Sequence, residues 1–131
     1  MDTSPPAIVT ITLNPAIDRA IRVQNLRPGG HVTGRTVSRV AGGKGVNVSR
    51  VLAAMGLGST AMGLLGRDNA SAFTDVFAGG AVRDGFLRVA GSTRDNVTVI
   101  DDATGQDTHI RDAGLAPGPA AVQELIEQIG A

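Results

Sequence analysis

The sequence of 131 residues has no cysteine, tryptophan or tyrosine, and only three phenylalanines. The absence of cysteine excludes a disulfide framework and any cysteine-based metal or redox centre. Because aromatic side chains are so scarce, the core must be built mainly from Val, Ile, Leu, Met and Ala. The chain is nevertheless long enough for one small domain with a hydrophobic core.

The sequence also lacks net charge and long apolar runs. Lysine and arginine total 12, as do aspartate and glutamate, so bulk charge favours neither nucleic acid nor an anionic membrane as a partner. No apolar run approaches the roughly 20 residues of a membrane-spanning helix. The N-terminal stretch MDTSPPAIVTITLNP lacks the basic start and long apolar core of a signal peptide. These absences favour a soluble cytoplasmic protein.

Glycine, by contrast, is abundant, with 18 residues and no low-complexity repeat. Glycine permits tight turns and a close approach of backbone to a ligand. The alternative is a general bias of the source toward small residues, and composition alone does not separate the two.

Apolar patterns predict the α/β part of the fold. Two runs, AIVTITL (7–13) and TAMGLLG (60–66), predict strands buried on both faces, as in a parallel sheet. Asp68-Asn69 predicts the cap of a short helix, and Pro119 the start of a last one. One apolar stripe at helical spacing predicts a helix between the two runs, with Val48, Val51, Leu52 and Met55 facing the core.

Shorter, alternating segments predict a second part with one solvent-exposed face. They occupy residues of about 19–40 and 86–111 and favour an antiparallel ribbon. The predicted fold class is therefore α/β: part of an open sheet with flanking helices, plus an antiparallel β ribbon. Residues 1–131 are expected to form a single domain.

The stretch AGGKG (41–45) predicts a binding loop at a helix start. The first amides of a helix have no internal partner and lie at the positive end of its dipole, and Lys44 and Asn47 add a charge and an amide. This arrangement suits a polyhydroxylated or phosphorylated small molecule. The alternative is a plain glycine-rich loop with a solvated lysine. A phosphate-binding P-loop is excluded because Gly45 stands where Ser or Thr is required.

Two further residues are candidates for the same site. Asp18 follows the first predicted strand, where ligands bind in open α/β sheets, and its carboxylate can accept sugar hydroxyls; the alternative is a turn or cap residue. Arg94 can bind phosphate oxygens in a bidentate way; the alternative is a surface charge. His31 and His109 have no nearby carboxylate pattern, so we interpret both as surface or ribbon histidines rather than ligands, and expect no metal site.

Three stretches in order, TITLNPAIDRAIRV, VAGGKGVNVSRVLAAMGLGSTAMGLLGRDN and VAGSTRDNVTVID, resemble the N-terminal half of the PfkB (ribokinase-like) carbohydrate kinases. Within that family they are most similar to the 1-phosphofructokinases and tagatose-6-phosphate kinases. The resemblance extends from Ala7 to about Leu115. It implies a ribokinase-like sheet, with the ribbon as a lid that covers the sugar and pairs two subunits in several relatives.

The resemblance also implies roles for the candidate residues. Asp18 and Asn47 would bind the sugar hydroxyls, and Lys44 and Arg94 the phosphate already on the substrate. Three glycines would let the loop backbone close around the sugar: Gly42, Gly43 and Gly45. The implied reaction transfers the γ-phosphoryl group of ATP, with Mg²⁺, to fructose 1-phosphate, giving fructose 1,6-bisphosphate.

The sequence departs from the family in one respect. The family's second half carries the ATP site and a Gly-Ala-Gly-Asp motif with the general-base aspartate, and this motif is absent here. We therefore expect no catalytic residue in this chain, weak or no binding of ATP and Mg²⁺, and no activity without a C-terminal half. The alternatives are a non-catalytic sugar-phosphate-binding module, a decayed remnant, or another PfkB kinase such as ribokinase.

Overall fold

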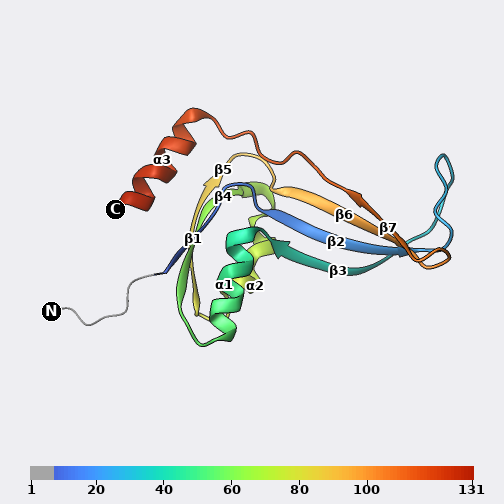
Figure 1. Ribbon diagram of the computed structural model, residues 1–131. Coiled ribbons are helices and arrows are strands. Elements are labelled where there is room, and N and C mark those ends of the chain that lie inside the picture. The colour runs from blue at the N-terminus through green and yellow to red at the C-terminus, as the bar shows by residue number, and fades with distance from the viewer. Residues whose placement is uncertain (1–7) are drawn as a thin grey trace.

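The computed structural model describes residues 8–131, which form two β-sheets with helices around one of them (Figure 1). The strands are β1 (Val9–Thr12), β2 (Ala16–Val23), β3 (Arg35–Gly42), β4 (Ser59–Gly66), β5 (Val82–Val89), β6 (Arg94–Asp101) and β7 (Gln106–Ile110). The helices are α1 (Lys44–Ala54), the 3-10 helix η1 (Arg67–Phe73), α2 (Thr74–Phe77) and α3 (Pro119–Gly130).

The first sheet is parallel, has the order β1-β4-β5, and contains the core of the molecule. Strand β4 lies in the middle and is buried almost throughout, which confirms the prediction from TAMGLLG. Its Ala61 and Leu65 pack into the cluster that α1 and α2 cover. All three phenylalanines of the sequence meet there, with Phe86 about 6 Å from the other two rings (6.2 and 6.3 Å between centroids).

The second sheet has the order β3-β2-β6-β7, and we call it the lid sheet. It extends away from the helices (Figure 1). Its outer pairs, β2–β3 and β6–β7, are antiparallel, but its central pair, β2–β6, is parallel. The expected antiparallel ribbon is therefore a mixed sheet. Residues 35–42 and 94–110 supply its later strands, whereas Phe86–Val89 belong to β5. The predicted start of the ribbon at residue 86 is wrong, because Phe86 is needed in the core.

The prediction that strand 7–13 is buried on both faces is wrong. Strand β1 is at the end of its sheet and pairs with β4 alone among the described residues. Thr10 and Thr12 face α1 and are buried, whereas Val9 and Ile11 are 46% and 45% exposed on the other face. Helix α3 contacts β4 and β5 and leaves that face of β1 uncovered. Ala7 lies outside the described residues.

The predicted core-facing stripe of α1 is also wrong. Val48, Val51 and Met55 are 52%, 60% and 68% exposed, while the buried side of the helix carries Val46 and Ser49. Small residues on that side let the helix lie close to β1 and β4. The Ser49 hydroxyl is bonded to Thr10 at 2.7 Å and accepts from Ser59 at 2.9 Å, so the helix is oriented by a buried polar chain rather than by its largest apolar residues.

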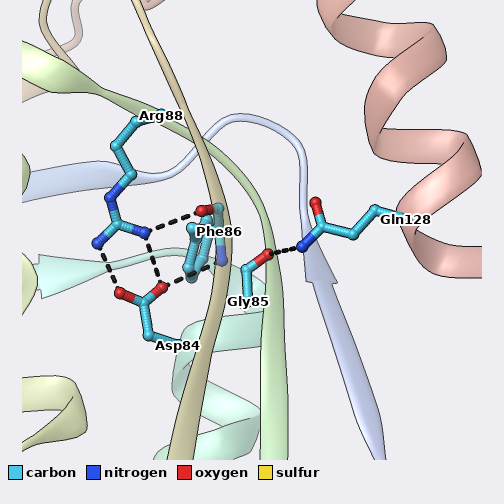
Figure 2. A network of polar contacts seen from close by, with 5 residues as sticks. All are labelled: Asp84, Gly85, Phe86, Arg88 and Gln128. Atoms are coloured by element: carbon cyan, nitrogen blue, oxygen red, sulfur yellow. Dashed lines mark hydrogen bonds and ion pairs between the residues drawn. The ribbon is translucent and has the colours of Figure 1, made fainter.

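Helix α3 starts at Pro119, as predicted, but only Leu125 of its apolar stripe is buried. Figure 2 shows Gln128 donating a hydrogen bond to the Gly85 carbonyl of β5, at 3.0 Å. On the same strand, Arg88 holds both carboxylate oxygens of Asp84, at 2.6 and 2.8 Å. Burial alone would raise the pKa of Asp84, but these hydrogen bonds outweigh it and lower the pKa below its ordinary value. The Gln128 bond joins α3 to β5, whereas the ion pair links two residues of β5 itself, on the other side of the strand in Figure 2.

Candidate functional site

A cavity of about 560 Å³ lies where β1 ends, α1 begins and the lid sheet faces them. It is at the carboxyl end of a parallel strand, which is where open α/β sheets bind ligands. Five of the seven predicted site residues line it: Asp18, Gly43, Lys44, Asn47 and Arg94. They come from β2, from α1 with its preceding loop, and from β6, so segments far apart in the sequence meet here.

The other two predicted residues, Gly42 and Gly45, flank the cavity and are buried. A β-carbon at Gly42 would lie 2.5 Å from Oδ2 of Asp18, and one at Gly45 would lie 2.8 Å from the Ile11 carbonyl oxygen. Gly43 has a φ of 135°, which side chains rarely adopt. The loop therefore requires glycine in order to fit against β1 and β2, whereas closure of its backbone around a sugar stays a prediction.

Thr12 at the end of β1 fixes the start of α1. Its Oγ1 accepts a hydrogen bond from the Val46 amide at 3.2 Å, and the Asn47 amide bonds to the Gly43 carbonyl at 2.9 Å. The helix has no side-chain cap of its own at Gly43, so a residue from another strand supplies the acceptor. This contact holds Lys44 and Asn47, both exposed to solvent, at the mouth of the cavity.

Asp18 is held by Asn96, a cavity residue that our sequence reasoning missed. The two are paired across the parallel strands β2 and β6, and Nδ2 of Asn96 donates to Oδ1 of Asp18 at 3.0 Å. The bond orients the carboxylate and leaves Oδ2 as an acceptor for hydroxyl groups. The signal was present in the sequence, because Asn96 is two residues after Arg94 and so on the same face of a strand.

Arg94 lies over the turn that follows β1. Its Nε donates to the Pro15 carbonyl at 3.3 Å and its Nη2 to the Asn14 carbonyl at 3.2 Å. Asn14 in turn donates to the Ala113 carbonyl at 3.4 Å. Three segments of the chain thus converge on this turn, with the guanidinium between them.

Asn69 positions the segment that carries Arg94. Its side chain donates to the Thr93 carbonyl and accepts from the Thr93 amide, both at 2.8 Å. Oγ1 of Thr93 also accepts a bond from the Gly66 amide at 2.9 Å. The prediction that Asp68-Asn69 caps the following helix is therefore wrong, since no side chain caps η1 or α2. The Asn69 amide instead ties η1 to the residue before β6, and the Thr93 hydroxyl ties that residue to the end of β4.

His109 is an exposed residue of β7, which agrees with its interpretation as a surface or ribbon histidine. It also lines the cavity, together with Arg111. Its Nδ1 lies 3.0 Å from Oγ1 of Thr98 on the paired strand β6. His31 is not among the residues that line the cavity. Sequence reasoning missed His109 because only the pairing of β6 with β7 brings it over the site.

Asp101 stabilises the far end of the lid sheet. It is 5% exposed and accepts hydrogen bonds from the amides of Asn25, Leu26 and Ala103, at 2.8, 2.9 and 3.0 Å. Burial alone would raise the pKa of Asp101, but the donated hydrogen bonds outweigh it and lower the pKa below its ordinary value. The carboxylate thereby joins the end of β6 to the segment that follows β2, at the end of the lid sheet away from the cavity.

Other kinds of site find less support within residues 8–131. No helix in this range is both long and apolar enough to cross a bilayer. No three His, Asp or Glu side chains in it gather into a group that could hold a metal ion. The lining of the cavity combines apolar residues such as Ile11, Leu13 and Val97 with polar and charged side chains.

Comparison with known proteins agrees with this architecture. Residues 8–128 match the pfkB family carbohydrate kinase profile. The 1-phosphofructokinase of Xanthomonas campestris pv. campestris is 38% identical over 121 residues, which cover 92% of this chain and 38% of that protein. The enzyme of the same name from Rhodobacter capsulatus is 41% identical over 119 residues, covering 86% and 36%. Phosphofructokinase-2 from Escherichia coli, solved in complex with fructose-6-phosphate, superposes with a TM-score of 0.81 at 27% identity, covering 94% and 41%.

The chain belongs to the pfkB family of carbohydrate kinases. This confirms the family resemblance and the predicted α/β, ribokinase-like fold class. The chain spans less than half the length of the curated relatives that it matches.

Proposed function

We propose that this chain is the sugar-phosphate-binding part of an ATP-dependent phosphofructokinase, with fructose 1-phosphate as its substrate. One observation carries the proposal: a single cavity gathers one carboxylate, Asp18, with the amide of Asn47 and the cations Lys44 and Arg94. A carboxylate and an amide suit sugar hydroxyls, and two cations suit a phosphate group. Similarity to several 1-phosphofructokinases favours the 1-phosphate over other sugar phosphates.

In this proposal each residue binds or orients the substrate and none transfers a proton. Asn96 orients Asp18 toward the sugar ring. Thr12 holds the start of α1. The two hydrogen bonds between Asn69 and the Thr93 backbone fix the segment that carries Arg94. ATP and Mg²⁺ would supply the phosphoryl group and its charge neutralisation. Within residues 8–131, no three His, Asp or Glu side chains gather into a group that could hold Mg²⁺. Phosphoryl transfer depends on positioned charges around the transferred group, and the Gly-Ala-Gly-Asp motif is absent from the sequence.

A second candidate, a tagatose-6-phosphate kinase site or a non-catalytic sugar-phosphate-binding module, would use the same residues.

A homodimer through the lid sheet is a further proposal. Strand β3 is at the edge of that sheet and its residues 35–40 are exposed, so its backbone is accessible for pairing with a second copy.

Calorimetric titration of the purified chain tests the binding proposal. We expect saturable binding of fructose 1-phosphate, weaker binding of tagatose 6-phosphate, and little binding of fructose. A stronger response to tagatose 6-phosphate would favour the second candidate, and no binding of any phosphorylated sugar would contradict the proposal.

A coupled assay with ATP and Mg²⁺ tests the chemistry. We expect no turnover by the 131-residue chain and restored turnover on addition of a separately expressed C-terminal half of a 1-phosphofructokinase. Turnover by the chain alone that an Asp18→Asn substitution abolishes would show that the catalytic groups are present after all.

A further inference from the structure

We propose that β7 supplies a phosphate-binding group to the cavity: the imidazole of His109, supported by the guanidinium of Arg111. This inference rests on the proposed function, because it names a contact for the phosphate of the same substrate. It assigns a binding role to a strand that the sequence motifs do not include.

The first argument is the fixed position of the imidazole ring. His109 lies directly across from Thr98 in the antiparallel pair β6–β7, and its Nδ1 is 3.0 Å from the Thr98 hydroxyl oxygen. The hydrogen bond orients the ring above the cavity that both residues line. Among the hydrogen bonds of residues 8–131, Nε2 of His109 has none, so this nitrogen is available to a ligand.

The second argument is the charge around the ring. Arg111 is two residues further along the chain, directly after the end of β7, and also lines the cavity. The fully charged side chains that line the cavity are three cations and one carboxylate: Lys44, Arg94, Arg111 and Asp18. Three cations against one carboxylate give this lining an excess of positive charge, which favours an anion such as phosphate.

The third argument concerns the proton on the ring. A hydroxyl group can donate to Nδ1, and a neutral imidazole then carries its proton on Nε2. An Nε2–H donor fits a phosphate oxygen, which only accepts. If Thr98 were instead the acceptor of a hydrogen bond from a neutral ring, Nε2 would be an acceptor and would suit a sugar hydroxyl. The proposal therefore commits to Thr98 as donor and to phosphate as the partner of Nε2.

Nuclear magnetic resonance of the imidazole C–H groups tests this directly, because the sequence has only two histidines. His31 and His109 can be assigned with His31→Ala and His109→Gln variants. We expect fructose 1-phosphate and inorganic phosphate to shift the His109 signal saturably, with His31 unmoved, and fructose to shift neither. Movement of His109 with fructose alone would overturn the assignment to phosphate.

The controls separate this inference from the proposed function. If the backbone amides of Gly43 and Lys44 shift with fructose 1-phosphate while His109 does not, the sugar-phosphate site stands and the role of His109 is refuted. If fructose 1-phosphate does not bind at all, the proposed function fails, and the titration with inorganic phosphate still decides the role of His109. No response of His109 to either ligand refutes it.

Matched substitutions give a second measurement. His109→Ala should weaken fructose 1-phosphate binding roughly tenfold, as expected for one hydrogen bond to a charged group. His109→Gln places an amide N–H near the position of Nε2 and should recover most of the affinity. His31→Ala should change nothing. Equal loss in the alanine and glutamine variants, with unchanged melting temperatures, would contradict a donated hydrogen bond.

Discussion

Replacing Arg94 by alanine should separate recognition of phosphate from the structure of the turn beneath it. The guanidinium is half-buried and donates to two backbone carbonyls, those of Asn14 and Pro15, at 3.2 and 3.3 Å. Both bonds are long and their acceptors are neutral, so their loss should lower stability only modestly, by about 1 kcal/mol. A charge-assisted hydrogen bond to phosphate contributes more, roughly 1.5–3 kcal/mol.

For fructose 1-phosphate, that loss corresponds to a roughly 10- to 150-fold higher Kd. Titration calorimetry with fructose 1-phosphate and with fructose should show the first ligand weakened and the second nearly unaffected. Arg94→Lys keeps the charge but not the planar pair of donors, so it should recover only part of the affinity. Thermal melts of both variants would measure the contribution of the turn separately.

The result that would refute this reasoning is equal weakening of both ligands. In that case Arg94 would support the turn at Asn14 and contact no phosphate. A loss of binding together with a large drop in melting temperature would likewise assign the residue a structural role, because the two carbonyl contacts would then explain the whole effect.

Two further predictions concern stability. Ser49→Ala should destabilise the fold by about 1–3 kcal/mol in chemical denaturation, because the buried hydroxyls of Thr10 and Ser59 lose their shared partner. Ser71→Ala, at an exposed position, is the control. An equal loss of stability in both variants would contradict a stabilising role for the buried hydroxyl network. Asp101 has a pKa below its ordinary value of 3.8 in the folded state, so its contribution should be present above that pH and be lost as pH falls through the folded-state pKa. The melting temperature of Asp101→Asn should therefore be below wild type at pH 7, and the difference should shrink below about pH 4; a constant difference would contradict the assignment.

The site residues that could be predicted are those carried by short local patterns. These patterns are the AGGKG loop, an aspartate (Asp18) after a predicted strand and an arginine (Arg94) at the start of another. Five of the seven predicted residues line one cavity. Their chemical role remains a prediction. Local spacing sufficed because the loop and helix start are built from consecutive residues, and because the end of a parallel strand is a general binding position.

The residues that were missed depend on pairing between distant strands. Asn96 and His109 reach the cavity through the β2–β6 and β6–β7 pairs, and a parallel β2–β6 pair is not specified by the alternation of either strand. The buried face of α1 was mispredicted for a different reason. Periodicity weights large apolar residues, whereas here the small, polar Ser49 faces the sheet and satisfies two buried hydroxyls.

Strand β1 gives the last prediction, which concerns association of the isolated chain. Within residues 8–131, β1 pairs on one side only, and Val9, Ile11 and the following Leu13 are 46%, 45% and 65% exposed. An uncovered apolar edge strand is a template for pairing with another chain. We therefore expect the 131-residue chain to be marginally stable or to self-associate, with a sedimentation coefficient that increases with protein concentration.

A charge on that strand should reduce the association. Val9→Lys places a cation on the exposed face of β1, where edge lysines oppose strand pairing, and should shift the sedimentation profile toward monomer. Val48→Lys adds the same charge at a position of similar exposure on α1, 52% against 46%, and should leave association unchanged. If the two variants behave alike, the edge of β1 is not the contact. A wild-type chain that sediments as a monodisperse monomer and melts cooperatively above about 60 °C, near the top of the mesophilic range, would show that the exposed strand destabilises nothing.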